Sequence, residues 1–302
     1  MASTTLGQAA LNRARAGLFE HGRQLEQLRF QHHFEAPIVD EVAAELARYQ
    51  NPDGGFGHGI EPDFWLPDSS PMATSVGLQI AVELELGANH PIVAKALDYL
   101  QQTFDPGLEC WAAVPPAVND FPHAPWWHHD PDKAPDIAGL QFNPGVELAG
   151  YLLRWGVSDY TAWVPGRVAQ TDSLEAHQLL CCLRLADSPG LPDEVRASLM
   201  ALVERCAAST VEVDPTNWDG YCIKPLSAIP SPGSPLASTF SAAIDAQLDF
   251  EIARQSAEHG LWMPHWSWYG KFEAAWSRAR LQWAGVITVD TLRALAAFGR
   301  VA

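Results

Sequence analysis

Residues 50–57 read Gln50-Asn-Pro-Asp-Gly-Gly-Phe-Gly57 and carry the strongest structural signal in the sequence. Glycine adopts positive φ angles without steric cost, so the adjacent glycines predict a tight turn. The side chain of Gln50 can end a preceding helix by bonding backbone groups, and the ring of Phe56 can pack under the turn. We therefore predict that this segment joins two helices.

A related pattern recurs further along the chain. The segments 53–75 and 217–239 each contain an Asp-Gly-aromatic turn, a loop, and a Ser-Pro pair that should begin a helix. A degenerate third copy is expected at 255–262. Repetition of one supersecondary unit predicts a ring of helical hairpins rather than two unrelated domains.

The rest of the chain has helical periodicity, and alternating β-branched runs are short. Asp172 followed by Glu175 predicts a capping box at the start of one helix. Helices joined by polar, Pro- and Gly-rich loops, with no sheet, must pack on one another. The expected helices are 6–31, 36–50, 71–87, 91–104, 144–155, 159–168, 173–187, 192–209, 235–257, 270–284 and 288–299.

Residues 50–57 resemble the Gln-x-x-Asp-Gly-Gly-Phe/Trp-Gly turn of squalene–hopene cyclases and of protein prenyltransferase β-subunits. In those families the turn connects an outer helix to an inner one. The resemblance implies an all-α fold, namely a single (α/α)6-type barrel that spans residues 1–302 as one domain. It implies less about activity, because the turn has a structural role in those families.

Two departures from these families concern chemistry. The chain has no Asp-x-Asp-Asp motif, with which squalene-type cyclases protonate their substrate. Prenyltransferase β-subunits bind zinc through Asp-x-Cys and a later histidine, whereas Asp219 and Cys222 have a different spacing. We therefore expect no zinc, no other metal and no cofactor.

The composition excludes several classes of function. The formal net charge is −17 and no run of basic residues occurs, which argues against nucleic acid and anionic membranes as partners. The five cysteines lack zinc-finger spacing and are expected to be reduced thiols. No apolar stretch approaches the roughly 20 residues of a membrane span, and no signal segment is evident. We expect a cytoplasmic protein, and its oligomeric state is not indicated.

The loop from His58 to Asp68 is the richest in ionisable groups. It contains His58, Glu61, Asp63, Trp65 and Asp68, and it precedes an expected inner helix. A carboxyl group beside an indole ring would have a raised pKa and could act as a general acid. The alternative is structural, with Asp68 favouring the helix dipole and Glu61 bonding loop amides.

A long segment at about 105–142 separates two expected helices. Loops longer than about 12–15 residues usually have a function or are disordered, and this one is too aromatic to be a disordered linker. We interpret it as a lid over a cavity, with Trp126, Trp127 and His128 facing a substrate. A metal site formed by the adjacent histidines 128 and 129 is not favoured.

Polar stripes mark three of the expected helices. Residues four apart share a helix face, so such stripes indicate either a polar patch inside a barrel or solvated faces. Asp245 is the best candidate for a buried acid, because Ile244, Leu248 and Phe240 surround it in the sequence. The stripes are Ser75, Gln79 and Glu83; His177, Cys181 and Arg184; and Ser241, Asp245 and Asp249.

A run of aromatic residues at 260–271 includes Trp262, His265, Trp266 and Trp268. Aromatic faces stabilise cations and also stack on sugars, which suits a terpenoid or a carbohydrate substrate. Packing in the protein core is the alternative.

Three functions remain open from the sequence. The first is a terpenoid-cyclase-like isomerase or lyase that protonates a hydrophobic, isoprenoid-type small molecule. The second is a carbohydrate-active enzyme with paired carboxylates, and the third is a non-catalytic ligand-binding or scaffold protein. The candidate catalytic residues are Asp63, Glu61, Asp245, His58 and Asp219. The candidate substrate-binding residues are Trp65, Trp126, Trp127, His128, Trp262, His265, Trp266 and Trp268.

Overall fold

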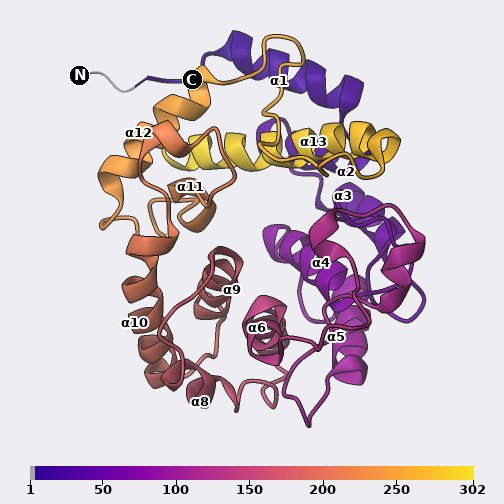
Figure 1. Ribbon diagram of the computed structural model, residues 1–302. Helices are drawn as coiled ribbons and strands as arrows, with labels where there is room; N and C mark the ends of the chain where they lie inside the picture. The colour runs from indigo at the N-terminus through magenta and orange to yellow at the C-terminus, as the bar shows by residue number, and fades with distance from the viewer. Residues whose placement is uncertain (1–3) are drawn as a thin grey trace. The chain divides into compact units, whose positions relative to one another are not determined.

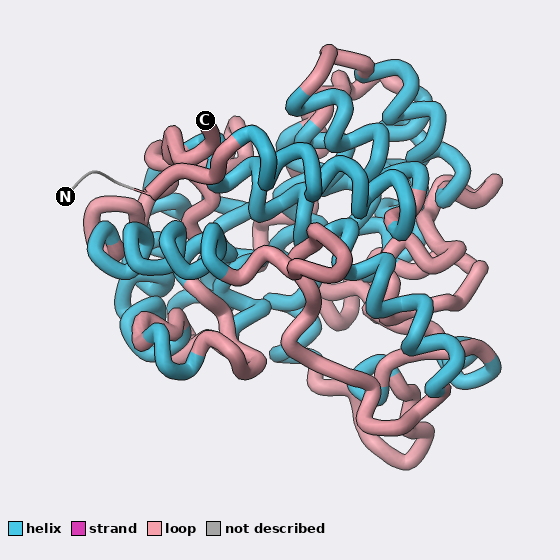
Figure 2. The backbone as a smooth tube through the Cα atoms, turned by 90° about the horizontal axis from the view of Figure 1, so that it is seen from above, coloured by secondary structure: helices cyan, strands magenta, loops and turns pink. Residues whose placement is uncertain are grey.

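The computed structural model describes residues 4–302, and this part of the chain is helical with no β-strand (Figure 2). The all-α class expected from the sequence is therefore confirmed. Backbone contacts divide the chain into two compact units. We call residues 46–210 the central unit, and residues 4–45 together with 211–302 the terminal unit.

In the central unit α4 contacts α5 and α7, α7 contacts α9, and α9 contacts α10. Its helices are α4 (Pro71–Glu83), α5 (Pro91–Thr103), α6 (Ile137–Leu140), α7 (Glu147–Arg154), α8 (Val164–Ala169), α9 (Ala176–Ala186) and α10 (Asp193–Thr210). Shorter helical turns are η1 (Ala47–Tyr49), η2 (Pro116–Asp120), η3 (Pro125–Trp127) and η4 (Gln141–Val146).

The terminal unit combines the two ends of the described chain. Its helices are α1 (Gln8–His21), α2 (Gln24–Phe34), α3 (Val39–Leu46), α11 (Pro225–Ala228), α12 (Ser241–Ala253) and α13 (Glu273–Ala297), with the short turn η5 (Pro215–Asn217). Helices α1 and α2 both pack against α13 (Figure 1). The backbone of Leu6 also pairs with the other end of the chain, donating to Arg300 O at 2.7 Å and accepting from Ala302 N at 2.9 Å.

Some helix starts agree with the sequence signals and others do not. Ser70 Oγ accepts from Ala73 N at 3.0 Å, so the predicted start of α4 is confirmed. Ser234 instead bonds Ser231, and α12 begins only at Ser241. The capping box at α9 is formed by Glu175 with Gln178, three residues later than predicted, because Glu175 has extended backbone angles and a side chain that reaches Gln178 N.

Two helix boundaries also differ from expectation. The segment 6–31 is two helices, because Gly22 has extended backbone angles between α1 and α2. The segments 270–284 and 288–299 are joined within the single helix α13. Gly285 continues that helix where it approaches α2, since a Cβ atom there would lie 3.4 Å from the side chain of Glu26.

The turn at 50–57 has the predicted architecture. Gln50 Nε2 donates to the carbonyl oxygens of Gly54 and Ile92, both at 2.9 Å, and so ties the turn to the start of α5. Gly54 has a φ of 94°, and a Cβ atom there would lie 2.1 Å from Lys95 O. Phe56 is fully buried, and its amide donates to Thr74 Oγ1 in α4 at 3.0 Å.

The segment 255–262 in the terminal unit repeats this arrangement. Gln255 Nε2 donates to Gly260 O and to Ala10 O, both at 2.8 Å. The φ of Gly260 is 69°. Trp262 is fully buried, and its amide donates to Thr288 Oγ1 at 3.0 Å. Each unit therefore contains one turn with the same hydrogen bonds.

The segment 217–239, which the sequence suggested as the second copy, has a different local structure. No glutamine bridges this turn, and Gly220 is not among the glycines with positive φ. Trp218 is held instead through its own ring, since Nε1 donates to Glu212 O at 2.9 Å. The expectation that 217–239 repeats the turn was therefore wrong, and 255–262 is the closer structural equivalent of 50–57.

The long segment at about 105–142 packs on the loop that precedes α4. Val118 belongs to a buried apolar cluster with Phe64, Leu66 and Met72. The two backbones also bond directly, since Trp65 N donates to Pro122 O at 3.1 Å and Ala124 N donates to Asp63 O at 2.9 Å. Within residues 4–302, no helix has both the length and the apolar character needed to cross a bilayer.

Candidate functional site

Glu61 and Asp63 lie where the loop before α4 meets the 105–142 segment. Trp127 Nε1 donates to Glu61 Oε1 at 2.9 Å. Asp63 is only 2% exposed, whereas Glu61 is partly exposed. The structure thus brings together two predicted acids and one predicted aromatic residue from separate parts of the central unit.

Glu61 has the properties of a proton donor. Burial of its carboxyl group and the neighbouring charge of Asp63 raise its pKa to about 8, and the hydrogen bond from Trp127 opposes this shift only in part. Glu61 therefore carries a proton at neutral pH. The sequence predicted an indole beside a carboxyl group, but the partner is Trp127, because Trp65 Nε1 donates to Pro62 O at 2.8 Å.

A pair of histidines adjoins this site through the backbone pairing of Phe64 with His123. The rings of His123 and His128 are stacked, with centroids 5.5 Å apart, and His123 Nε2 lies 3.2 Å from His128 Nδ1. His123 Nδ1 faces Phe121 O at 2.7 Å and must carry a hydrogen, so Nε2 accepts from His128 when the ring is neutral. His58 bonds Asn51 Oδ1 at 2.9 Å instead of joining either acid.

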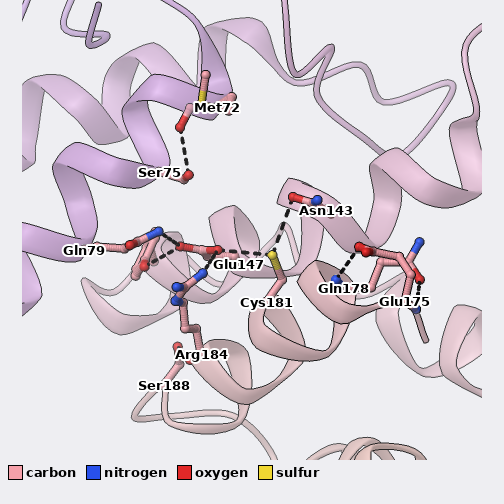
Figure 3. Close-up of polar contacts among 11 residues, drawn as sticks. Met72, Ser75, Gln79, Asn143, Glu147, Glu175, Gln178, Cys181, Arg184 and Ser188 are labelled. Atoms are coloured by element: carbon pink, nitrogen blue, oxygen red, sulfur yellow. Dashed lines mark hydrogen bonds and ion pairs between the residues drawn. The ribbon is translucent and has the colours of Figure 1, made fainter. Parts of the chain in front are cut away.

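A second polar cluster surrounds Glu147, which is 2% exposed (Figure 3). Gln79 Nε2 and Tyr151 Oη donate to Glu147 Oε1 at 2.8 and 2.7 Å. Arg184 Nη1 and Cys181 Sγ donate to Oε2 at 2.8 and 3.2 Å. One carboxylate thus joins helices α4, α7 and α9.

The charge of Glu147 is stabilised by its neighbours. Burial alone would raise the pKa of Glu147, but Arg184 and the hydrogen bonds from Tyr151, Cys181 and Gln79 lower it overall. Both oxygens are occupied by donors, so this group is suited to holding helices together rather than to moving protons. The sequence pointed to Gln79, Cys181 and Arg184 as polar stripes, but Glu147 was missed because it stands among apolar residues.

The third polar stripe is on the surface. The side chain of Asp245 is 79% exposed and lies 3.7 Å from Arg300, which also contacts the 57% exposed Asp249. The expectation that Asp245 is a buried acid was therefore wrong. Asp219 in the same unit is also exposed.

The remaining predicted aromatic residues have different environments. Trp262 and Trp268 are fully buried in the core of the terminal unit. Trp268 packs against Trp276 with ring centroids 5.7 Å apart. Trp266 is partly exposed and packs edge-to-face with Tyr221 at 6.0 Å. Trp126 in the central unit is 46% exposed.

His265 belongs to a basic cluster that the sequence did not reveal. Lys224 Nζ lies 2.5 Å from His265 Nε2, and Arg254 Nη1 contacts the same nitrogen. Among residues 4–302, no three His, Cys, Asp or Glu side chains are grouped so that they could hold a metal ion.

Comparisons with known proteins found no matching family model, no matching curated protein and no matching solved structure.

Proposed function

We propose that the protein is a terpenoid-cyclase-like isomerase or lyase, in which Glu61 protonates a hydrophobic, isoprenoid-type small molecule. The observation that carries this proposal is the neutral carboxyl group of Glu61, which is hydrogen-bonded to an indole and remains partly exposed. The recurrence of the glutamine turn at 50–57 and 255–262 supports a single (α/α)6-type barrel as the overall architecture.

The surroundings of Glu61 suit an apolar substrate. Trp127, its hydrogen-bond partner, packs edge-to-face on Phe64 with ring centroids 5.9 Å apart. Both rings adjoin the apolar cluster that includes Leu66 and Met72. Aromatic groups of this kind stabilise positive charge that develops on a substrate.

The acidity of Glu61 restricts which atom it can protonate. A carboxyl group with a pKa near 8 is a weak acid, and proton transfer from it is best matched to an oxygen atom. We therefore propose an isoprenoid alcohol or epoxide as the substrate. The substrate oxygen takes the proton from Glu61 while the C–O bond breaks, and the electrons of that bond stay on the oxygen. A carbocation and the Glu61 carboxylate remain. Trp127 Nε1–H then stabilises that carboxylate.

Asp63 gives specific support to a second candidate function. Its charge contributes to the raised pKa of Glu61, so the two carboxyl groups are electrostatically coupled. A coupled pair of carboxyl groups in one site is also the arrangement with which glycoside-cleaving enzymes work. Carbohydrate chemistry is therefore the alternative, with the same proton donor and a polar substrate.

The test is a product assay with Glu61→Gln and a matched control. Purified protein is incubated with isoprenoid alcohols and epoxides, with and without magnesium, and in parallel with aryl glycosides. We expect product from an isoprenoid, a loss of at least about 100-fold in Glu61→Gln, and near-normal activity in Asp68→Asn, which changes an exposed acid of the same loop. The rate should fall as pH rises through about 8, where Glu61 loses its proton.

Cleavage of the glycosides alone would establish the alternative function. Turnover of neither class of compound, with no binding detected by calorimetry, would reject both and favour a non-catalytic role. Equal rates for Glu61→Gln and the unmodified protein would remove Glu61 as the acid.

A further inference from the structure

Lys224 in the terminal unit is only 6% exposed, and its neighbours include other basic side chains. Its Nζ is 2.5 Å from His265 Nε2, and the guanidinium of Arg254 reaches the same ring nitrogen. The ring of Phe250 lies beside both cations, with its centroid 5.5 Å from Lys224 Nζ and 5.4 Å from Arg254 Cζ. Two basic side chains thus converge on one imidazole nitrogen.

The imidazole nitrogen cannot satisfy both donors well. Nε2 of a neutral histidine has a single lone pair and accepts one strong hydrogen bond. Burial lowers the pKa of His265 to about 4, with the charges of Lys224 and Arg254 adding to the effect, so the ring is neutral at pH 7. A hydrogen bond with the backbone of Asp219 holds the ring in place. Two positive charges beside one neutral acceptor repel each other, and this repulsion is relieved when Lys224 gives up a proton.

The electrostatic surroundings also favour a neutral amine at Lys224. Burial and, to a smaller extent, the charge of Arg254 lower the pKa of Lys224 to about 8, against opposing contributions from Glu251, Cys222 and Asp219. Glu251 Oε2 lies 3.8 Å from Arg254 Nη1, so the negative charge of Glu251 acts on Arg254 as well as on Lys224. About a tenth of Lys224 is therefore an uncharged amine at pH 7.

Burial and an adjacent cation are the two devices that make a lysine nucleophilic in enzymes. A nucleophile, a hydrogen-bond acceptor within reach of it, and a third group that orients the acceptor form the usual catalytic arrangement. Lys224, His265 and the Asp219 backbone match these roles.

We propose that Lys224 is a reactive amine that forms an imine with a small aldehyde or ketone. The Nζ lone pair attacks the carbonyl carbon, and the carbonyl oxygen takes up the proton that nitrogen releases, giving a carbinolamine. The nitrogen lone pair then expels the hydroxyl group, which leaves as water with the remaining proton of the nitrogen, so that a neutral C=N bond is formed. This site is in the terminal unit and is independent of Glu61.

The test is competitive labelling of the full chain with acetaldehyde and sodium cyanoborohydride, which reduces an imine to a stable ethylamine. The chain has four lysines, and Lys95, Lys133 and Lys271 are exposed and serve as internal references. Peptide mass mapping at pH 7 should show Lys224 labelled at least about tenfold faster than each reference. Its labelling rate should level off as pH rises through about 8.

Variants separate activation from simple exposure. Arg254→Gln removes the adjacent cation, so it should shift the midpoint for Lys224 labelling to higher pH and slow labelling at pH 7. Arg280→Gln changes an exposed arginine of α13 and should leave both unchanged. Circular dichroism confirms that each variant is folded. Failure to label Lys224 while the three references react, or a midpoint that does not respond to Arg254→Gln, would overturn the proposal.

Discussion

Glu147 is a buried carboxylate whose two oxygens receive four donors from three helices. Removing this carboxylate leaves its buried hydrogen-bond donors without an acceptor, which typically costs about 1–3 kcal/mol. We expect Glu147→Ala to lower the free energy of unfolding by about this amount, measured by urea denaturation. The control Glu204→Ala, on the exposed face of α10, should change it by less than about 0.5 kcal/mol. Similar values for both variants would contradict the structural role of Glu147.

Glu147 also makes the stability of the folded protein depend on pH. Because the pKa of Glu147 is lower in the folded protein than in the unfolded chain, its contribution to stability is complete above the ordinary carboxyl pKa. That contribution is lost as pH falls through the pKa of Glu147 in the folded protein.

The environments of individual residues were only partly predictable. Asp245 was expected to be buried because its sequence neighbours are apolar, but on a helix adjacent residues point in different directions, so Ile244 faces the core and Asp245 faces solvent.

The glutamine turns are the elements that the two units share. Each glutamine donates to one carbonyl of its own turn and to one in a neighbouring helix, and leaving the buried turn carbonyl unpaired costs about 1–3 kcal/mol. We expect Gln50→Ala and Gln255→Ala each to lower the free energy of unfolding by that amount. Gln102→Ala, at an exposed position in α5, is the matched control and should be nearly neutral. A loss in only one of the two glutamine variants would show that the turns are not equivalent.

Among the turns, the sequence predicted one correctly and was misleading for another. Residues 50–57 contain the glutamine, the glycines and the aromatic ring that shape the turn, so its local structure was predictable. The match at 217–239 shared the Asp-Gly-aromatic letters but lacked the glutamine whose amide makes the bonds. The turn at 255–262 matches the sequence pattern less closely, since one additional residue separates Gln255 from its aromatic partner Trp262. The glutamine that donates the hydrogen bonds, rather than the similarity of the other residues, determines the geometry of the turn.

For the whole molecule, the two compact units predict local rather than global responses to substitution. Gln50→Ala should accelerate amide hydrogen exchange within residues 46–210, and Gln255→Ala should do so within residues 4–45 and 211–302. Mass spectrometry of peptic fragments measures both responses in the intact protein. Equal acceleration across all fragments in either variant would show that the units open as one.

The sequence predicted the helical class of the whole chain because periodicity and capping are local properties. It did not predict which distant groups meet. The contact of Glu61 with Trp127 depends on how the 105–142 segment packs through Val118 and Phe64. The contact of Lys224 with His265 likewise joins residues far apart in the chain. Such sites require tertiary packing that no local pattern encodes.

The pairing of Leu6 with Arg300 and Ala302 has a consequence for biosynthesis. Helices α1 and α2 leave the ribosome first, yet α13, against which they pack, is translated after the whole of residues 46–210. The central unit can therefore fold on the ribosome while Leu18, Leu25 and Phe30 of the nascent chain still lack their partner. These apolar side chains therefore remain without their packing partner until α13 has been synthesised, so the terminal unit forms later than the central unit.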